Sequence, residues 1–305
     1  MPQLSFSTLL SSIFYLIPLY LFVFAPLLRT LSPQPTTNIF DPDDASIPLD
    51  PDTDISLDPE ILSLPDGIIP SCPEDNYRVH LLSKEPLVIY IEDFLSTAEA
   101  DHLLEMSSTN YTPSIIYNGV TTKIDPSTRL SDRALLPRDN TVRCLEARAS
   151  AFQGWKPHLY IERMWAQRYN VSGHYAHHFD WAGSAARGGD RLSTFMVYLD
   201  DDCEGGGTNF PRLRMPRGAA GGGEWCRFLE CADITTTTAT NSSMKTGDQN
   251  VIGDGAPVKG NAIFWENLRA DGSGYPETWH ASFPVTRGLK VGLNIWSWYQ
   301  PPRRR

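Results

Sequence analysis

Basic residues are missing from a long stretch near the start of this chain. Between Arg29 and Arg78 the sequence has no lysine or arginine, but it has eleven aspartates and glutamates. Proline and serine are frequent there too, and such a composition buries too little apolar surface to offset the entropy of ordering. We therefore expect residues 31–85 to form an acidic, flexible linker. With a formal net charge of −10, the chain also lacks the basic surface that nucleic-acid binding requires.

Two common signatures of catalysis are missing as well. The sequence contains neither the G-x-S-x-G pattern around a nucleophilic serine nor the P-loop that surrounds a nucleotide phosphate. Internal repeats are also missing. Hydrolysis through a covalent serine, threonine or cysteine intermediate therefore has no support in the sequence.

Cysteine is scarce and odd in number. The chain has five cysteines, so at least one of them is unpaired within a monomer. Cys226 and Cys231 lie close together in a loop-like stretch and suggest a disulfide, with Cys203 as a further candidate partner. The remaining two are Cys72 and Cys144, and the spacing of the five is not typical of a zinc module.

Charged side chains are absent from residues 9–28, which read LLSSIFYLIPLYLFVFAPLL. This run is about as long as a helix needs to span the apolar layer of a membrane. It exceeds the apolar part of a usual signal peptide, and no A-x-A cleavage site follows it. We therefore interpret residues 1–30 as an uncleaved signal-anchor with a transmembrane segment, and a cleaved signal peptide is the alternative.

From Pro86 onward the pattern changes to short apolar runs. A strand and turn are expected at residues 86–96, and helices at residues 96–108, with Ser96 or Thr97 as N-cap, and 140–152. Segments rich in β-branched and aromatic residues then predict strands at 158–170, 191–201, 260–268, 281–285 and 289–299. The expected fold is mostly β with flanking helices: a double-stranded β-helix, or jelly roll, with the N-terminal helices packed on one sheet. Residues 212–258 are expected to form a loop insertion, and residues 301–305 a basic tail.

Two histidines and an aspartate form a candidate metal site. In a strand, residues i and i+2 face the same side, so His178 and Asp180 can face one ion while His177 and Phe179 point away. His280 follows about a hundred residues later. Two imidazoles and one carboxylate are typical of the facial triad that leaves coordination positions open for a co-substrate and O2. His-x-Asp by itself is a weak signal, because such pairs are usually surface groups.

Lys290 opens the strand that follows His280 and a turn at residues 286–288. Such a hairpin can place its ammonium group in the same barrel mouth as the histidine. A buried lysine is costly unless its charge is paired, and a dicarboxylate co-substrate would supply the partner. Taken singly, an ordinary surface lysine on an edge strand is the alternative.

Short motifs follow one another in order between Pro86 and Tyr299. Their residues are Arg168, Tyr169, Gly173, Tyr175, His178, Asp180, Arg191, Thr194, Tyr198, Leu199, Gly205–Pro211, Lys259, Gly260, Ala262, Phe264, Trp265, His280, Pro284, Val285, Gly288, Lys290 and Trp296. As an ordered set they resemble the catalytic domain of prolyl 4-hydroxylase alpha subunits and their plant, algal and fungal relatives. Two departures are Gly207, where the family commonly has glutamate, and Trp298, where it often has histidine.

The resemblance implies a role for each group of residues in a catalytic domain at residues 86–300. Iron(II) would be bound by His178, Asp180 and His280. The co-substrate 2-oxoglutarate would be bound by Lys290 with Tyr169 and Thr208. The peptide groove would be lined by Tyr175, Arg191 and Trp296. The implied reaction is 4-hydroxylation of peptidyl proline, as in procollagen-proline 4-dioxygenases, with O2 as second co-substrate, ascorbate as reductant, and succinate and CO2 as products.

Three alternatives to this function remain at the level of the sequence. A 2-oxoglutarate dioxygenase could act on another peptidyl residue or on a small molecule, since Trp298 stands where the family contacts its substrate. A zinc hydrolase could use the same His178, Asp180 and His280, but it leaves Lys290 without a role. A membrane-anchored peptide-binding protein without activity would give no reason to keep the triad.

The expected location is the endoplasmic reticulum membrane or the secretory pathway. The anchor and linker suit a lumenal enzyme that reaches nascent chains from the membrane, so a single-pass type II arrangement is favoured. Sequons at Asn110, Asn170 and Asn241 would carry glycans only in that compartment. Arg29 argues weakly for the opposite orientation by the positive-inside rule. The sequence does not predict an oligomeric state.

Overall fold

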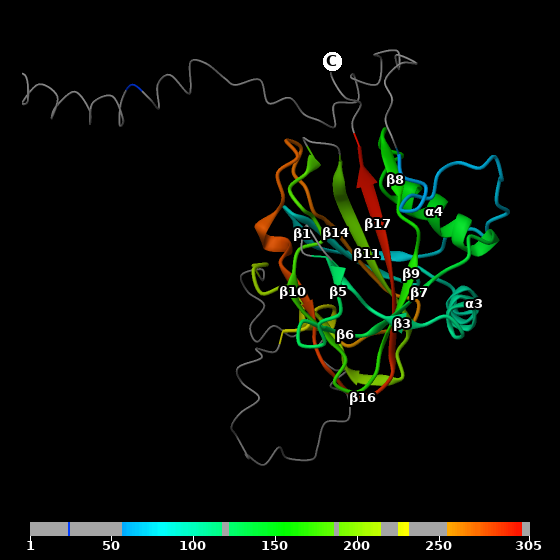
Figure 1. Cartoon of the computed structure of the whole chain (residues 1–305). Helices are drawn as coiled ribbons and strands as arrows, with labels where there is room; N and C mark the ends of the chain where they lie inside the picture. Colours follow the sequence, from blue (N-terminus) through cyan, green and yellow to red (C-terminus); the bar gives the residue numbers. More distant parts are fainter. Residues whose placement is uncertain are drawn as a thin grey trace, which may run out of the picture.

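The computed structural model describes residues 57–117, 122–185, 189–214, 225–231 and 255–300, together with Phe24. This part of the chain is mostly antiparallel β-sheet with two α-helices (Figure 1). The predicted membrane segment, apart from Phe24, residues 31–56 of the predicted linker and the tail at 301–305 lie outside the described residues. Among the residues it does describe, the structure has no helix long and apolar enough to cross a membrane.

A nine-stranded antiparallel sheet forms the larger layer of the fold. Its main path has the order β1-β2-β14-β11-β17-β9-β7-β3, and β8 also pairs with β17. The strands are β1 (Arg78–Lys84), β2 (Leu87–Glu92), β14 (Ala262–Glu266), β11 (Asp190–Asp200), β17 (Lys290–Tyr299), β9 (Trp165–Tyr169), β7 (Asp132–Leu135), β3 (Thr112–Pro113) and β8 (Leu159–Ile161). Nearly every residue of β11 is buried, as expected for a central strand covered on both faces.

A four-stranded antiparallel sheet forms the smaller layer. Its order is β13-β15-β10-β6, with β13 (Thr208–Asn209), β15 (His280–Ser282), β10 (His174–His178) and β6 (Arg129–Leu130). Two short pairs complete the described strands: β12 (Cys203–Gly205) with β16 (Val285–Gly288), and β4 (Ile116–Tyr117) with β5 (Thr122–Lys123). The 3-10 helix η6 (Pro276–Thr278) leads directly into β15, and η4 (Trp225–Arg227) lies in the insertion.

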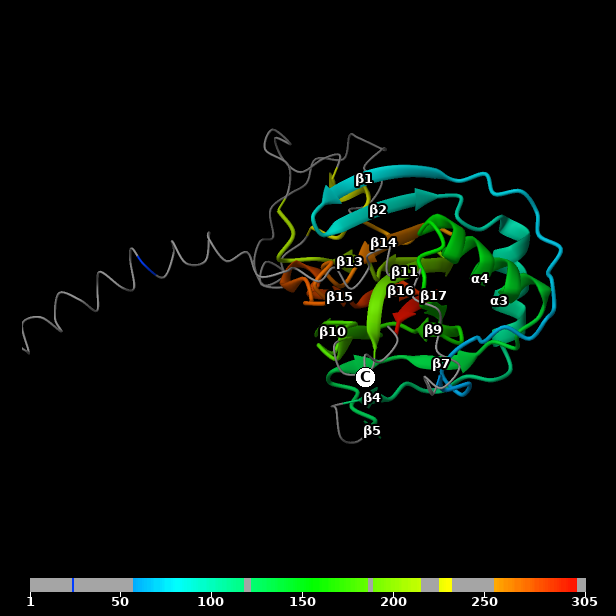
Figure 2. The same cartoon turned by 90° about the horizontal axis from the view of Figure 1, so that it is seen from above.

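Two helices cover the large sheet. Helix α3 (Thr97–Ser107) starts in a capping box, in which Ser96 accepts from the backbone N–H of Glu99 and Glu99 accepts from that of Ser96. Helix α4 (Asn140–Phe152) is N-capped by Asp139. Their apolar faces share one core cluster with β11, β14 and β17. In Figures 1 and 2 both helices lie across the large sheet from β10, so they support the layer that the functional site uses.

The expectation of a flexible linker fails for its described portion, residues 57–85. This segment contains β1, the bridge between Leu62 and Glu162, and a disulfide from Cys72 to Cys144 of α4. Its acidic residues do not simply repel one another, because Asp66 pairs with two arginines near the start of α4 and Asp75 pairs with Arg148. Composition misled here because the compensating positive charges come from a different part of the chain.

The disulfides agree only in part with the sequence. Cys226 and Cys231 are paired, and Cys203 is the free cysteine. The pair between Cys72 and Cys144 joins residues 72 positions apart, which no local pattern indicates. Part of the predicted insertion is packed rather than loose: Trp225, Cys226 and Leu229 share an apolar cluster with Tyr198 and Trp265.

Candidate active site and metal centre

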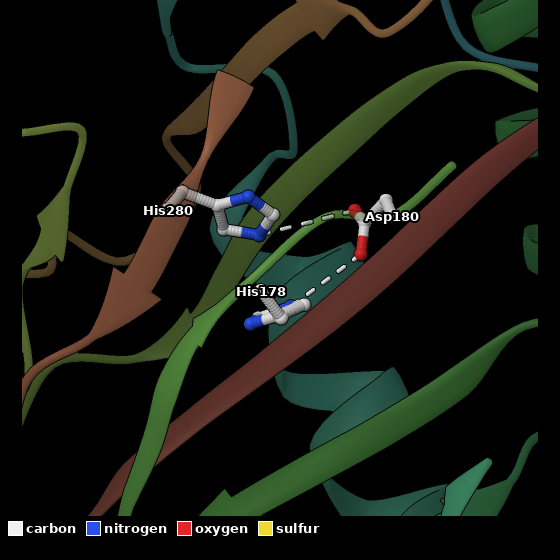
Figure 3. A group of neighbouring side chains, drawn as sticks. All are labelled: His178, Asp180 and His280. Atoms are coloured by element: carbon white, nitrogen blue, oxygen red, sulfur yellow. Dashed lines mark ion pairs between the residues drawn. The ribbon is translucent and has the colours of Figure 1, made fainter. Parts of the chain in front are cut away.

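The metal triad is assembled by pairing β10 with β15. His178 ends β10 and His280 begins β15, and the two are cross-strand partners in the register of the small sheet. Asp180 lies two residues beyond the end of β10, in a bend rather than in the predicted strand, and its carboxylate still reaches the two histidines. The ligand atoms of the three residues all lie within 4.8 Å of one another. Figure 3 shows both imidazoles turned toward the carboxylate.

Backbone carbonyls orient both imidazole rings. The Nδ1 of His178 lies 2.9 Å from the carbonyl of Ala176, and the Nδ1 of His280 lies 2.9 Å from that of Thr278. A carbonyl only accepts, so each Nδ1 carries the proton and each Nε2 keeps its lone pair. These Nε2 atoms lie 3.5 Å and 4.0 Å from oxygens of Asp180. This is the arrangement expected of histidines that bind a metal.

The charges of the triad also suit a metal ion. Burial lowers the pKa of His280 to about 4, and the neighbouring His178 adds to that effect. His280 is therefore a neutral ligand near pH 7. Burial by itself would raise the pKa of Asp180, but His280 and His178 outweigh it and the pKa lies well below its usual value. Two imidazoles and one carboxylate fit Fe(II) in a 2-His-1-carboxylate site.

Lys290 lies fully buried in the same pocket. Its Nζ donates to the carbonyl of Gly206 at 2.5 Å and to Oγ of Ser282 at 2.8 Å. None of the acidic side chains in the described part of the chain forms an ion pair with it, and burial lowers its pKa to about 7. Gly206 has a φ of +74°, which favours glycine, and a Cβ there would make a tight contact of 3.0 Å with Cδ of Lys290. The pocket thus holds a buried lysine that has no counter-ion among the described residues.

Seven of the nine predicted site residues line this one pocket. They are Tyr169, Tyr175, His178, Asp180, Thr208, His280 and Lys290. Tyr169 pairs with Lys290 across β9 and β17, and the lysine Nζ lies 5.1 Å from its ring centroid. Thr208 is 3 % exposed and hydrogen-bonds the hydroxyl of Tyr198 at 3.0 Å. Tyr175 stacks on His178, with the ring centroids 3.6 Å apart.

The other two predicted residues, Arg191 and Trp296, adjoin the pocket without lining it. Trp296 donates from Nε1 to Oδ2 of Asp180 at 3.1 Å. The guanidinium of Arg191 lies 3.7 Å from the ring centroid of Trp296 and forms two hydrogen bonds to Glu162, at 2.6 and 2.8 Å. His177 points away from the triad, toward Asn209, as predicted.

Several residues of the pocket were given no role in the sequence analysis. The pocket is completed by Gln167, Met196, Trp265, Ala281, Ser282 and Asn294. Ser282 follows His280 by two positions in β15, so strand alternation was the one pattern that could have placed it beside Lys290. Asn267 touches the triad only through Thr194, a contact between β11 and the end of β14 that no spacing along the chain reveals.

Comparison with known proteins agrees with this geometry. Residues 164–298 match the family model of the 2OG-Fe(II) oxygenase superfamily. Prolyl 4-hydroxylase 5 of Arabidopsis thaliana is 27 % identical over 224 residues, which cover 72 % of this chain and 70 % of the relative. Prolyl 4-hydroxylase subunit alpha-3 of Bos taurus is 28 % identical over 231 residues, which cover 72 % of this chain and 35 % of the relative. The match thus spans about a third of the alpha-3 subunit's length.

Among solved structures, the viral collagen prolyl hydroxylase vCPH of Paramecium Bursaria Chlorella virus-1, in its 2OG complex, is 23 % identical. It aligns with a TM-score of 0.48 and covers 70 % of this chain and 96 % of its own. The superfamily uses Fe(II), 2-oxoglutarate and O2, as predicted from the motifs, and the His178, Asp180 and His280 triad fits that metal. The chain is therefore similar to the 2OG-Fe(II) oxygenase superfamily over residues 164–298 and to prolyl 4-hydroxylases over 72 % of its length.

Proposed function

We propose that this protein is a prolyl 4-hydroxylase that uses Fe(II) and 2-oxoglutarate to hydroxylate proline in a peptide or protein. The observation that carries the proposal is the uncompensated Lys290 in the pocket of the metal triad. A buried ammonium without a counter-ion is costly, and the distal carboxylate of 2-oxoglutarate supplies that counter-ion. The named relatives support proline as the substrate residue.

Each residue of the pocket has a distinct task in this proposal. With its cofactor and co-substrates bound, the site couples oxidative decarboxylation of 2-oxoglutarate to succinate and CO2 with hydroxylation of a substrate C–H bond. His178 and His280 would hold the metal through Nε2, and Asp180 would hold it through its carboxylate. Lys290 binds the distal carboxylate, with Tyr169 and Thr208 beside it, and ascorbate is the external reductant.

In this proposal Tyr175 in the pocket, with Arg191 and Trp296 beside it, contacts the peptide substrate. Glu162 already neutralises Arg191, so the guanidinium offers its flat face and its remaining N–H groups rather than a free charge. Such a surface suits the ring and carbonyl groups of a proline-containing peptide better than an acidic side chain. These residues pose the substrate carbon beside the metal and keep water away.

We also propose a fold type, a domain boundary and a cellular compartment for this protein. The two sheets form a double-stranded β-helix whose open end holds the metal, with α3 and α4 as outer support. The domain begins near residue 57, earlier than residue 86, because the segment before β2 is cross-linked to α4. Two disulfides favour the lumen of the secretory pathway, where residues 1–30 would serve as the signal-anchor.

A zinc hydrolase could use the same three ligands but gains nothing from a buried lysine. For a zinc hydrolase, burial of the Lys290 ammonium group would remain unfavourable, because no anion would compensate its charge. The dioxygenase accounts for both the triad and the lysine, so it is the better explanation of the pocket.

Turnover with defined peptides tests the proposal. The purified protein is incubated with Fe(II), 2-oxoglutarate, ascorbate and pools of proline-containing peptides. Succinate is quantified, and mass spectrometry locates the gain of one oxygen atom. Amino-acid analysis must then identify 4-hydroxyproline. Oxygen on another residue would restrict the proposal to dioxygenase chemistry, and zinc-supported hydrolysis without succinate from any peptide would overturn it.

A further inference from the structure

A chain of three hydrogen bonds leads from Trp265 to the carboxylate of Asp180. Trp265 Nε1 lies 2.9 Å from Asn267 Oδ1, and Asn267 Nδ2 lies 3.0 Å from Thr194 Oγ1. Thr194 Oγ1 lies 2.8 Å from Asp180 Oδ2. Asn267 and Thr194 are 0 % exposed and Trp265 is 1 % exposed, so water cannot replace a missing partner in this series of hydrogen bonds.

Chemistry fixes the direction of every bond in this chain. An indole N–H can only donate, so Asn267 has to turn its oxygen toward Trp265 and its NH2 toward Thr194. The amide N–H then occupies a lone pair of the threonine oxygen. The single hydroxyl proton of Thr194 is left for Asp180, which accepts it as a carboxylate. The orientation of Asn267 thus determines that Thr194 donates rather than accepts.

The hydrogen bond from Thr194 is one of two that converge on the same carboxylate oxygen. Trp296 Nε1, also a pure donor, lies 3.1 Å from Asp180 Oδ2. The other oxygen, Oδ1, lies 3.5 Å from Nε2 of His178. With Oδ2 occupied by two donors, the carboxylate cannot rotate about its Cβ–Cγ bond without losing both hydrogen bonds.

We propose that Asn267, held by Trp265, is a positioning residue of the metal centre. It makes Thr194 a donor to Asp180 and thereby keeps Oδ1 aimed at the metal. The inference rests on the proposed function only in requiring that the triad binds a divalent ion. It concerns metal affinity and is independent of the substrate that is hydroxylated.

Reversing the polarity at position 267 provides the test. In Asn267→Asp the side chain can only accept, so the proton of Thr194 turns toward position 267 and Asp180 faces a lone pair. Dissociation constants for Mn(II) and Co(II) are measured by calorimetry on the purified protein without 2-oxoglutarate. We expect Thr194→Val and Asn267→Asp each to weaken metal binding about 10–100-fold, the usual effect of losing a hydrogen bond to a ligand. Thr194→Ser should stay close to the parent.

The double variant separates positioning from a general structural effect. If Asn267 acts through Thr194, then Asn267→Asp in the Thr194→Val background should weaken metal binding little further. Additive losses would overturn the proposal, as would parent-like affinity in Asn267→Asp. A protein that shows this pattern without hydroxylating proline would refute only the proposed function.

Asn261→Asp is the matched control for a buried charge. Asn261 is 8 % exposed, accepts from the backbone of Asp93 and donates to Tyr90, with no contact to the triad. Its substitution should leave metal affinity unchanged, and an equal loss there would count against the proposal.

If Asn267→Asp fails to fold, a second variant is available. Trp265→Phe removes the indole N–H, so the Asn267 amide is free to rotate by 180° and exchange its oxygen and NH2. Trp265→Phe should lower metal affinity in the parent protein but not in the Thr194→Val variant. Equal losses in the two backgrounds would overturn the proposal.

Discussion

In the proposed function, binding of the co-substrate depends on the buried ammonium group of Lys290. In Lys290→Ala the distal carboxylate of 2-oxoglutarate would lose a desolvated partner, which costs about 3–5 kcal/mol. Binding should therefore weaken by roughly two to four decades, at ~1.4 kcal/mol per decade. The measurement is the 2-oxoglutarate dependence of succinate release, with metal content as the control. Lys290→Arg should rescue only in part, because its fork needs a different geometry. Parent-like 2-oxoglutarate dependence in Lys290→Ala would remove the lysine from the site.

The protonation of Lys290 makes 2-oxoglutarate binding depend on pH. Burial lowers its pKa from the usual 10.5 to about 7, so the free protein loses the positive charge as the pH rises through that value. Only the ammonium form pairs with the dicarboxylate. Affinity should be full below about pH 7 and fall up to about tenfold per pH unit above it. Calorimetry from about pH 6 to about pH 9 measures this slope, which should vanish in Lys290→Met.

At the scale of a single strand, alternation along β10 separates two adjacent histidines. His178 faces Asp180 and His280, whereas His177 points to the other side, where its Nε2 lies 3.1 Å from Oδ1 of Asn209. His178→Ala should abolish turnover and most metal binding, since one of three ligands is lost. His177→Ala should be mild by comparison. Both are measured by 2-oxoglutarate decarboxylation and by metal content, and equal inactivity of the two variants would refute the assignment of strand faces.

The contact between the N-terminal segment and α4 is an element-scale source of stability. The disulfide between Cys72 and Cys144 closes a loop of 72 residues, whereas that between Cys226 and Cys231 closes one of 5. In the chain-entropy model these closures stabilise the fold by about 4 and about 2 kcal/mol. Replacing each pair by alanine should therefore lower the free energy of unfolding more for the long loop. Urea unfolding measures both, and the reverse order would show that the N-terminal segment adds little to the folded domain.

For the whole molecule, the compartment decides whether the sequons are used. Asn110 and Asn170 are exposed in the structure, and Asn241 lies outside the described residues. If the domain is lumenal, the expressed protein should shift in gel mobility on treatment with a glycosidase. Asn110→Gln and Asn170→Gln should each remove part of the shift. A protein that runs unchanged and fractionates with the cytosol would exclude both the anchor and its orientation.

Local patterns were sufficient for most elements of the fold. The helices at 97–107 and 140–152 agree with their apolar spacing and caps, and each segment predicted as a strand after Trp155 overlaps at least one strand. These properties act over a few residues, so they can be seen in the sequence. The predicted turn at 286–288 was wrong, because these residues belong to β16, and β12 and β13 were not predicted. The pairing of β11 with β14 and β17, and the cross-link from Cys72 to α4, join distant segments and left no such trace.

The residues of the site, like the elements of the fold, were predicted only in part from local patterns. The sequence alone determined which side chains are available: the spacing of His178 and Asp180 predicted that they face the same side, and His280 and Lys290 stand at the motif positions of the family. Only the tertiary structure decided that Lys290 is buried with no acid partner among the residues that the structure describes, and that Arg191 is already neutralised by Glu162. It also joined Trp265, Asn267 and Thr194 into one chain of hydrogen bonds that ends on Asp180. Burial and hydrogen-bond direction depend on neighbours from other strands, and spacing along one chain does not encode them.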